Sequence, residues 1–206
     1  MENVIVAVFK DQSKTYQALS ELKSKVVTEQ YAILEAAVVK KEQERIVMTD
    51  GFSASGNGEW LTGGLIGSIV GILGGPIGML LGGSLGAIIG ATKEGDDKLD
   101  NASIMFTTAE KLVNGDLALV LLAQEQREHA MDHYLLQLDP VYIMRKDVEV
   151  VEEEIERAQE VEQELRRDAR ERMRERRQEE RQEKLDSFKS KIKMEFEQLK
   201  DKFSSN

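Results

Sequence analysis

Cysteine is absent from the 206 residues of this chain, and only two histidines and two prolines occur. Without cysteine there is no disulfide, no thiolate metal site and no cysteine nucleophile. The absence fits a reducing compartment. The N-terminal residues MENVIVAVFKDQ carry no basic stretch of the kind that opens a signal peptide. We therefore expect the first apolar run to be a strand.

Positive charge is also in short supply, because 38 acidic residues outweigh 28 basic ones and the formal net charge is -10. An acidic balance argues against a broad nucleic-acid surface. The arginine-rich stretch RRDARERMRERRQ contains interleaved acidic residues and no aromatic residue, which also disfavours RNA binding. No GK[ST] follows the many glycines, so they do not form a phosphate loop.

The two histidines, His129 and His133, are four residues apart on a predicted helix, a spacing that can share a metal ion. On that helix they lie opposite the apolar face of Met131, Leu135 and Leu138, so we expect them in solvent. No serine stands in a strained strand-to-helix turn. The sequence therefore predicts no catalytic residue, no metal site and no cofactor.

Short apolar runs separated by polar turns predict strands over residues 3–9, 31–39, 45–48, 116–123 and 141–144. Helices are expected after Asp11, over 101–113 and over 126–138. Two strand–helix–strand units in one antiparallel sheet predict an α+β, ferredoxin-like sandwich. The material between them is then an insertion. The predicted parts are a first half over 1–50, an apolar insert over 51–100, a second half over 101–147 and a charged helix over 148–206.

The insert contains a charge-free run from Leu61 to Ala91 in which glycine recurs every fourth residue. Two series, out of phase at Gly74-Gly75-Pro76, predict two short helices, roughly 62–73 and 76–91, joined by a tight turn. Each series places glycine along one helical stripe, which favours close helix–helix packing. The candidate contact residues are Gly63, Gly67, Gly71, Gly75, Gly78, Gly82, Gly86 and Gly90.

Three settings are open for this glycine hairpin. A single transmembrane span has sufficient length, yet it would separate the two halves of the sheet. Helices of 12–16 residues suit a re-entrant or interfacial position, with lysine and arginine before the segment and lysine after it. In the third setting, neighbouring subunits bury the apolar faces. A pore has little support, because the segment has no polar stripe that could line a lumen beyond Ser68 and Ser84.

The C-terminal region from about Val148 to Phe203 has no glycine or proline and predicts one long helix. Its apolar residues follow a narrow stripe, closer to an eleven-residue than a seven-residue repeat. Matching of its acidic and arginine-rich blocks would favour ordered assembly, and a merely solvated helix is the alternative. The last segment also fits an anionic membrane surface. The candidate partner contacts are Leu185, Phe188, Ile192, Phe196, Leu199 and Phe203.

Residues 1–145 resemble a bacterial family of membrane-associated proteins catalogued as domain of unknown function 1269. The resemblance rests on NVIVAVFKDQSKTYQALSELK, AILEAAVVKK, GGLIGSIVGILGGPIGMLLGGSLGA and NGDLALVLLAQE, in that order. It implies a bacterial source and membrane association, at or in the inner face of the cell membrane. It supplies no catalytic residues, and it does not cover the long tail.

Two functions follow as hypotheses. The first is a non-enzymatic, homo-oligomeric scaffold that assembles through the glycine hairpin and the long helix, with the membrane contacting residues 61–91. The second is a soluble regulatory module, in which a ferredoxin-like sheet senses a small ligand and the long helix transmits the signal. No feature of the sequence identifies that ligand.

Overall fold

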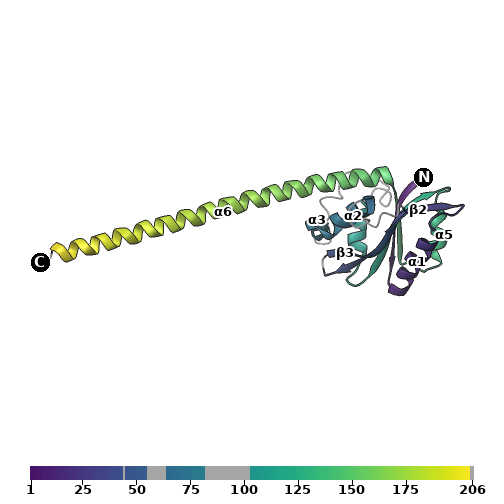
Figure 1. The fold of residues 1–206 in the computed structure, drawn as a ribbon, viewed down its shortest axis with the longest axis horizontal. Coiled ribbons are helices and arrows are strands. Elements are labelled where there is room, and N and C mark those ends of the chain that lie inside the picture. Colours follow the sequence, from purple (N-terminus) through teal and green to yellow (C-terminus); the bar gives the residue numbers. More distant parts are fainter. Residues whose placement is uncertain (44, 55–63, 82–102, 205–206) are drawn as a thin grey trace, which may run out of the picture. The chain divides into compact units, whose positions relative to one another are not determined.

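The computed structural model describes residues 1–43, 45–54, 64–81 and 103–204. It confirms an α+β chain with an antiparallel sheet of five strands and a long C-terminal helix (Figure 1). Contacts divide the chain into two units, Met1–Val161 and Glu162–Asn206. The first fourteen residues of the long helix therefore belong to the folded domain and not to the tail.

The sheet has the strand order β3-β2-β4-β1-β5, and all neighbouring strands are antiparallel. The strands are β1 (Glu2–Phe9), β2 (Tyr31–Glu42), β3 (Arg45–Ser53), β4 (Leu117–Glu125) and β5 (Tyr142–Asp147). All five lie where short apolar runs predict strands. The third extends further than predicted, because Asp50 and Gly51 continue to pair with β2.

The helices are α1 (Gln12–Ser24), α2 (Gly64–Gly74), α3 (Pro76–Leu81), α4 (Ile104–Lys111), α5 (Ala130–Leu136) and α6 (Val148–Ser204). The helical break between α2 and α3 falls at Gly75, as the sequence Gly-Gly-Pro predicts. By contrast, α5 is shorter than the predicted helix over 126–138. His129 has φ 65°, which is a left-handed conformation. A right-handed helix does not include such a residue, so α5 begins after His129.

Side chains of β1 alternate between two apolar cores, one on each face of the sheet. Val4, Val6 and Val8 lie in the first core, and Ile5 and Phe9 in the second. The first core is covered by α2, α3, α4 and the start of α6, and the second by α1 and α5 (Figure 1). The sheet is thus the middle of three layers.

The apolar helix α2 supplies much of the cover of the first core. Ile66, Ile69, Ile72 and Leu73 are all buried there, next to strand residues such as Val39. The described part of the predicted hairpin therefore buries its apolar face on the chain's own sheet. Within the described ranges, no helix combines the length and the apolar character that a membrane crossing requires.

Candidate functional site

The best-defined polar cluster lies at one end of the sheet and joins β1, β4, β5 and the start of α5. Glu125 ends β4 with a side chain fully shielded from solvent, and Arg145 comes from β5 with 12% of its side chain exposed. Arg145 Nε donates to Glu125 Oε2 at 3.1 Å, and Nη2 donates to Oε1 at 3.2 Å. Asn3 Nδ2 donates to Oε2 at 2.9 Å, and the backbone N–H of Met131 donates to Oε1 at 2.8 Å.

A second carboxylate completes this cluster. Asp132 accepts from Arg145 Nη2 at 2.7 Å and from Nη1 at 3.1 Å, and its Oδ2 lies 2.8 Å from His129 Nδ1. His129 also contacts Arg145 Nη1. Burial raises the pKa of Asp132, but the hydrogen bonds and charge of Arg145, with a smaller contribution from His129, outweigh it. The pKa therefore lies below its usual value.

These contacts use the hydrogen-bonding capacity of Arg145 and Glu125. Each donor nitrogen of Arg145 has an acceptor, and both oxygens of Glu125 accept two hydrogen bonds. No buried polar side-chain atom lacks a partner in the described part of the chain. The arrangement ties together four elements of the fold.

The predicted histidine pair is separated by the start of α5. His129 precedes the helix and contacts Asp132, while His133 is exposed and its Nε2 lies 3.3 Å from Gln137 Nε2. Among the described residues, no three or more Asp, Glu and His side chains converge in a way that would hold a metal ion.

A second buried carboxylate, Glu154, fixes α6 to α4. Its Oε2 accepts from Ser103 Oγ at 2.8 Å and from the backbone N–H of Ile104 at 3.0 Å, so it caps the N-terminus of α4. Lys146 Nζ lies 3.9 Å from its Oε1. Burial raises the pKa of Glu154, while Ser103, Lys146 and the backbone N–H groups of α4 partly oppose that effect.

An open hollow of about 410 Å³ lies between the start of β2 and α5. Tyr134, one of its lining residues, donates from its hydroxyl to Glu21 Oε2 at 3.0 Å. Burial, together with that hydrogen bond, raises the pKa of Tyr134. The other lining residues are Lys25, Thr28, Glu29, Gln30, Tyr31, Ala130, His133 and Gln137. Both signs of charge face this hollow, and no convergent set of donors singles out one ligand.

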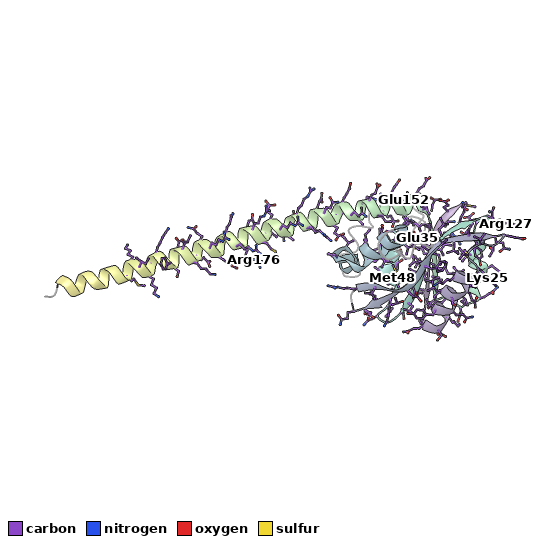
Figure 2. The ribbon with its side chains drawn as sticks, in the orientation of Figure 1. Lys25, Glu35, Met48, Arg127, Glu152 and Arg176 are labelled. Carbon is purple, nitrogen blue, oxygen red and sulfur yellow. The ribbon has the colours of Figure 1, made fainter. Side chains whose placement is uncertain are left out.

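The candidate glycines have unequal surroundings. Gly71 is exposed, and a Cβ added there would meet no atom within 4 Å. Gly67 is half-buried and lines a small hollow with Glu35 and Met48, both labelled in Figure 2. Gly75 is half-buried and Gly78 is buried against the backbone of Leu73. The remaining candidates, Gly63, Gly82, Gly86 and Gly90, lie outside the described residues.

Close backbone approach does occur at Gly74, at the end of α2. A Cβ there would lie 2.7 Å from the carbonyl oxygen of Ile46 in β3. Close approach in the described part of the hairpin therefore occurs within one chain, between α2 and β3 at Gly74 and between α3 and the backbone of Leu73 in α2 at Gly78. The packing of two glycine stripes against each other is not seen among these residues.

The candidate residues of the tail are exposed where their side chains are described. The exposed fractions are 52% for Leu185, 61% for Phe188 and 38% for Ile192. The side chains of Phe196, Leu199 and Phe203 lie outside the described part. Side chains along α6, such as Arg176, extend into solvent (Figure 2). The described part of the predicted stripe is thus exposed.

Two positioning carboxylates, Glu125 and Glu154, are missing from the sequence-based candidates. Glu154 could have been noticed, because it falls within the stripe of Val151, Ile155 and Ala158, where a charge is unusual. Glu125 carries no such signal, since its partner Arg145 is twenty residues away on another strand.

Comparison with known proteins returns no match to this chain among family models, curated proteins or solved structures. The resemblance to the membrane-associated bacterial family therefore stays a prediction.

Proposed function

We propose that this chain is a non-enzymatic scaffold protein that self-associates, with α6 making the contacts between copies. The observation that carries the proposal is the exposure of apolar side chains along α6 beyond Val161. Leu165 is 39% exposed and Met173 is 64% exposed, although both lie on one face of the helix with Ala169. A helix needs a partner to bury such a stripe.

Leu165, Ala169 and Met173 form the first stripe of α6. The charges on its two sides favour a second copy of α6, in parallel orientation, as the partner that buries it. At roughly 100° per residue, one flank of the stripe carries Arg166, Arg170, Arg177 and Arg181, and the other carries Asp168, Arg172, Glu175 and Glu179. Opposite flanks meet in a parallel pair of helices, so arginine would face mainly carboxylate. In an antiparallel pair, arginine would face arginine.

The contacts between the start of α6 and the folded domain also support this proposal, because they anchor the helix. Val151, Ile155 and Ala158 are buried in the first core, and Glu154 is hydrogen-bonded to the start of α4. The strand order β2-β4-β1-β5 fits the predicted ferredoxin-like arrangement, with β3 as an addition at the edge. We keep the glycine series at Gly82, Gly86 and Gly90 as a proposed second contact between copies.

The test is the mass of the full chain by light scattering across a range of concentrations. The chain is expected to form dimers or higher species that weaken with dilution. Leu165→Glu/Met173→Glu is expected to shift it to monomer, because buried unpaired carboxylates are costly. Glu160→Gln/Glu164→Gln, exposed on the same helix, is the control. A wild-type chain that stays monomeric at all concentrations contradicts the proposal.

A further inference from the structure

The end of α6 has a second apolar stripe that differs from the first in direction and in surroundings. Leu185, Phe188 and Ile192 lie within an arc of about 60° on the helix. The sequence continues the same spacing at Phe196, Leu199 and Phe203, which widens the arc to about 80°. Projected along the helix, this arc is centred about 140° from Ala169. It is therefore not a continuation of the face proposed for self-association.

Lysines border this second stripe on both sides. In the helical projection Lys189, Lys193 and Lys200 lie along one edge, and Lys184, Lys191 and Lys202 along the other. In the same projection, the acidic residues Asp186, Glu197 and Asp201 lie farther from the second stripe than the lysines do. Glu195 is the one acidic residue of this segment at an edge of the stripe. Lys184, Lys189, Lys191 and Lys193 are all exposed.

This charge pattern disfavours a second copy as the partner of the terminal stripe. Parallel and antiparallel pairing would both bring lysine-rich edges together, and like charges across a helix pair are destabilising. A flat anionic surface suits the pattern better. Its interior accepts the phenylalanine and leucine side chains, while lysines at the boundary reach upward to negative headgroups.

We infer that residues 184–203 of α6 form an amphipathic helix that binds the surface of anionic membranes. The helix lies in the plane of the interface, with Phe188 and Ile192 inserted and the flanking lysines near lipid phosphates. Each such lysine contributes roughly a fivefold gain in binding. The inference goes beyond the proposed self-association, because it assigns a different partner to a different face of the same helix.

The experiment is flotation of the full chain with vesicles in a density gradient. One set of vesicles is an equal mixture of phosphatidylglycerol and phosphatidylcholine, and the other is phosphatidylcholine alone. The chain is expected to float with the first set, to stay behind with the second, and to lose binding at high salt. Phe188→Glu/Ile192→Glu is expected to abolish flotation, while Leu165→Glu/Met173→Glu floats like the wild type.

A matched charge series tests the lysines. Lys189→Gln/Lys193→Gln is expected to weaken binding to the anionic vesicles roughly 25-fold. Lys10→Gln/Lys23→Gln makes the same change in net charge at exposed positions outside the terminal segment and should cost far less. The helical signal in circular dichroism checks that each variant folds.

Several results would overturn the inference. They are an absence of flotation, equal binding to phosphatidylcholine vesicles, equal losses from the two charge variants, or flotation that survives Phe188→Glu/Ile192→Glu. A lower mass for Phe188→Glu/Ile192→Glu would also overturn it, because the terminal stripe would then join copies of the chain. The masses of the same variants, measured by light scattering, show independently of flotation whether self-association has failed.

Discussion

Arg145 and Glu125 connect β5 to β4 across β1, with a two-point contact between the guanidinium and the carboxylate at 3.1 and 3.2 Å. The Glu125 side chain is fully shielded from water, so its charge depends on this partner and on the hydrogen bonds from Asn3 and Met131. Loss of one member of a buried ion pair leaves an uncompensated charge, which is costlier than loss of both.

We therefore expect Arg145→Met to lower the free energy of unfolding by about 3 kcal/mol. The double variant Arg145→Met/Glu125→Met should recover part of that loss, because the fully shielded charge of Glu125 is removed with its partner. The recovery is only partial, since Asp132, with 25% of its side chain exposed, still loses Arg145. Scanning calorimetry of the folded domain is the measurement. Arg157→Ala, which breaks an exposed pair with Glu153, is the control and should change stability by less than about 0.5 kcal/mol. If Arg145→Met is as mild as Arg157→Ala, the network does not hold the strands together.

The apolar helix α2 is part of the first core, and its removal from that core should be costly. Ile69 is 2% exposed and lies among the residues that cover the sheet. Ile69→Ala is expected to destabilise the folded domain by about 2–4 kcal/mol, because it leaves a cavity. Ile192→Ala removes the same atoms from the exposed tail and should leave the melting temperature of the domain unchanged. Equal melting temperatures for Ile69→Ala and the wild type would mean that α2 does not pack on the sheet in solution.

Two glycines three residues apart should respond in opposite directions. Gly71→Ala is expected to stabilise the domain by about 0.5–1 kcal/mol, because Gly71 is exposed in a helix interior with free space around it. Gly74→Ala should destabilise it, since the new Cβ would meet the carbonyl of Ile46 at 2.7 Å. Chemical denaturation compares the two variants. If Gly71→Ala destabilises the domain or disrupts assembly, the glycine stripe packs against a partner there.

Glu154 should make the stability of the α6 attachment depend on pH. Its pKa is raised by burial above the usual 4.5, so the folded state binds a proton more tightly than the unfolded state does. Stability from this group is complete below pH 4.5 and falls as the pH rises through the folded-state pKa.

Glu154→Gln removes this titration and keeps an oxygen that can accept from Ile104. We expect its melting temperature to depend less on pH above 4.5 than that of the wild type. Glu153→Gln makes the same charge change at an exposed position and should leave the wild-type slope intact. Parallel slopes for Glu154→Gln and the wild type would contradict this assignment.

The sequence alone determined the elements of this fold. The β-branched apolar run in NVIVAVF, the break at Gly75 before Pro76 and the uninterrupted helix formers after Val148 are local signals. Local signals determine local structure, because backbone conformation depends on side chains a few residues away. The α+β class and the long terminal helix could therefore be predicted.

Only the tertiary structure decided what the apolar run from Gly64 covers. A charge-free, glycine-rich helix has the same sequence signature whether it meets lipid, a second subunit or its own sheet. The first face of the sheet is apolar and must be buried, and Ile66, Ile69 and Leu73 pack against it. The pairing of Arg145 with Glu125 was equally hidden, since it depends on β5 and β4 lying on either side of β1. Hydrophobic burial has no direction of its own, so the geometry of the sheet decides which apolar surfaces meet.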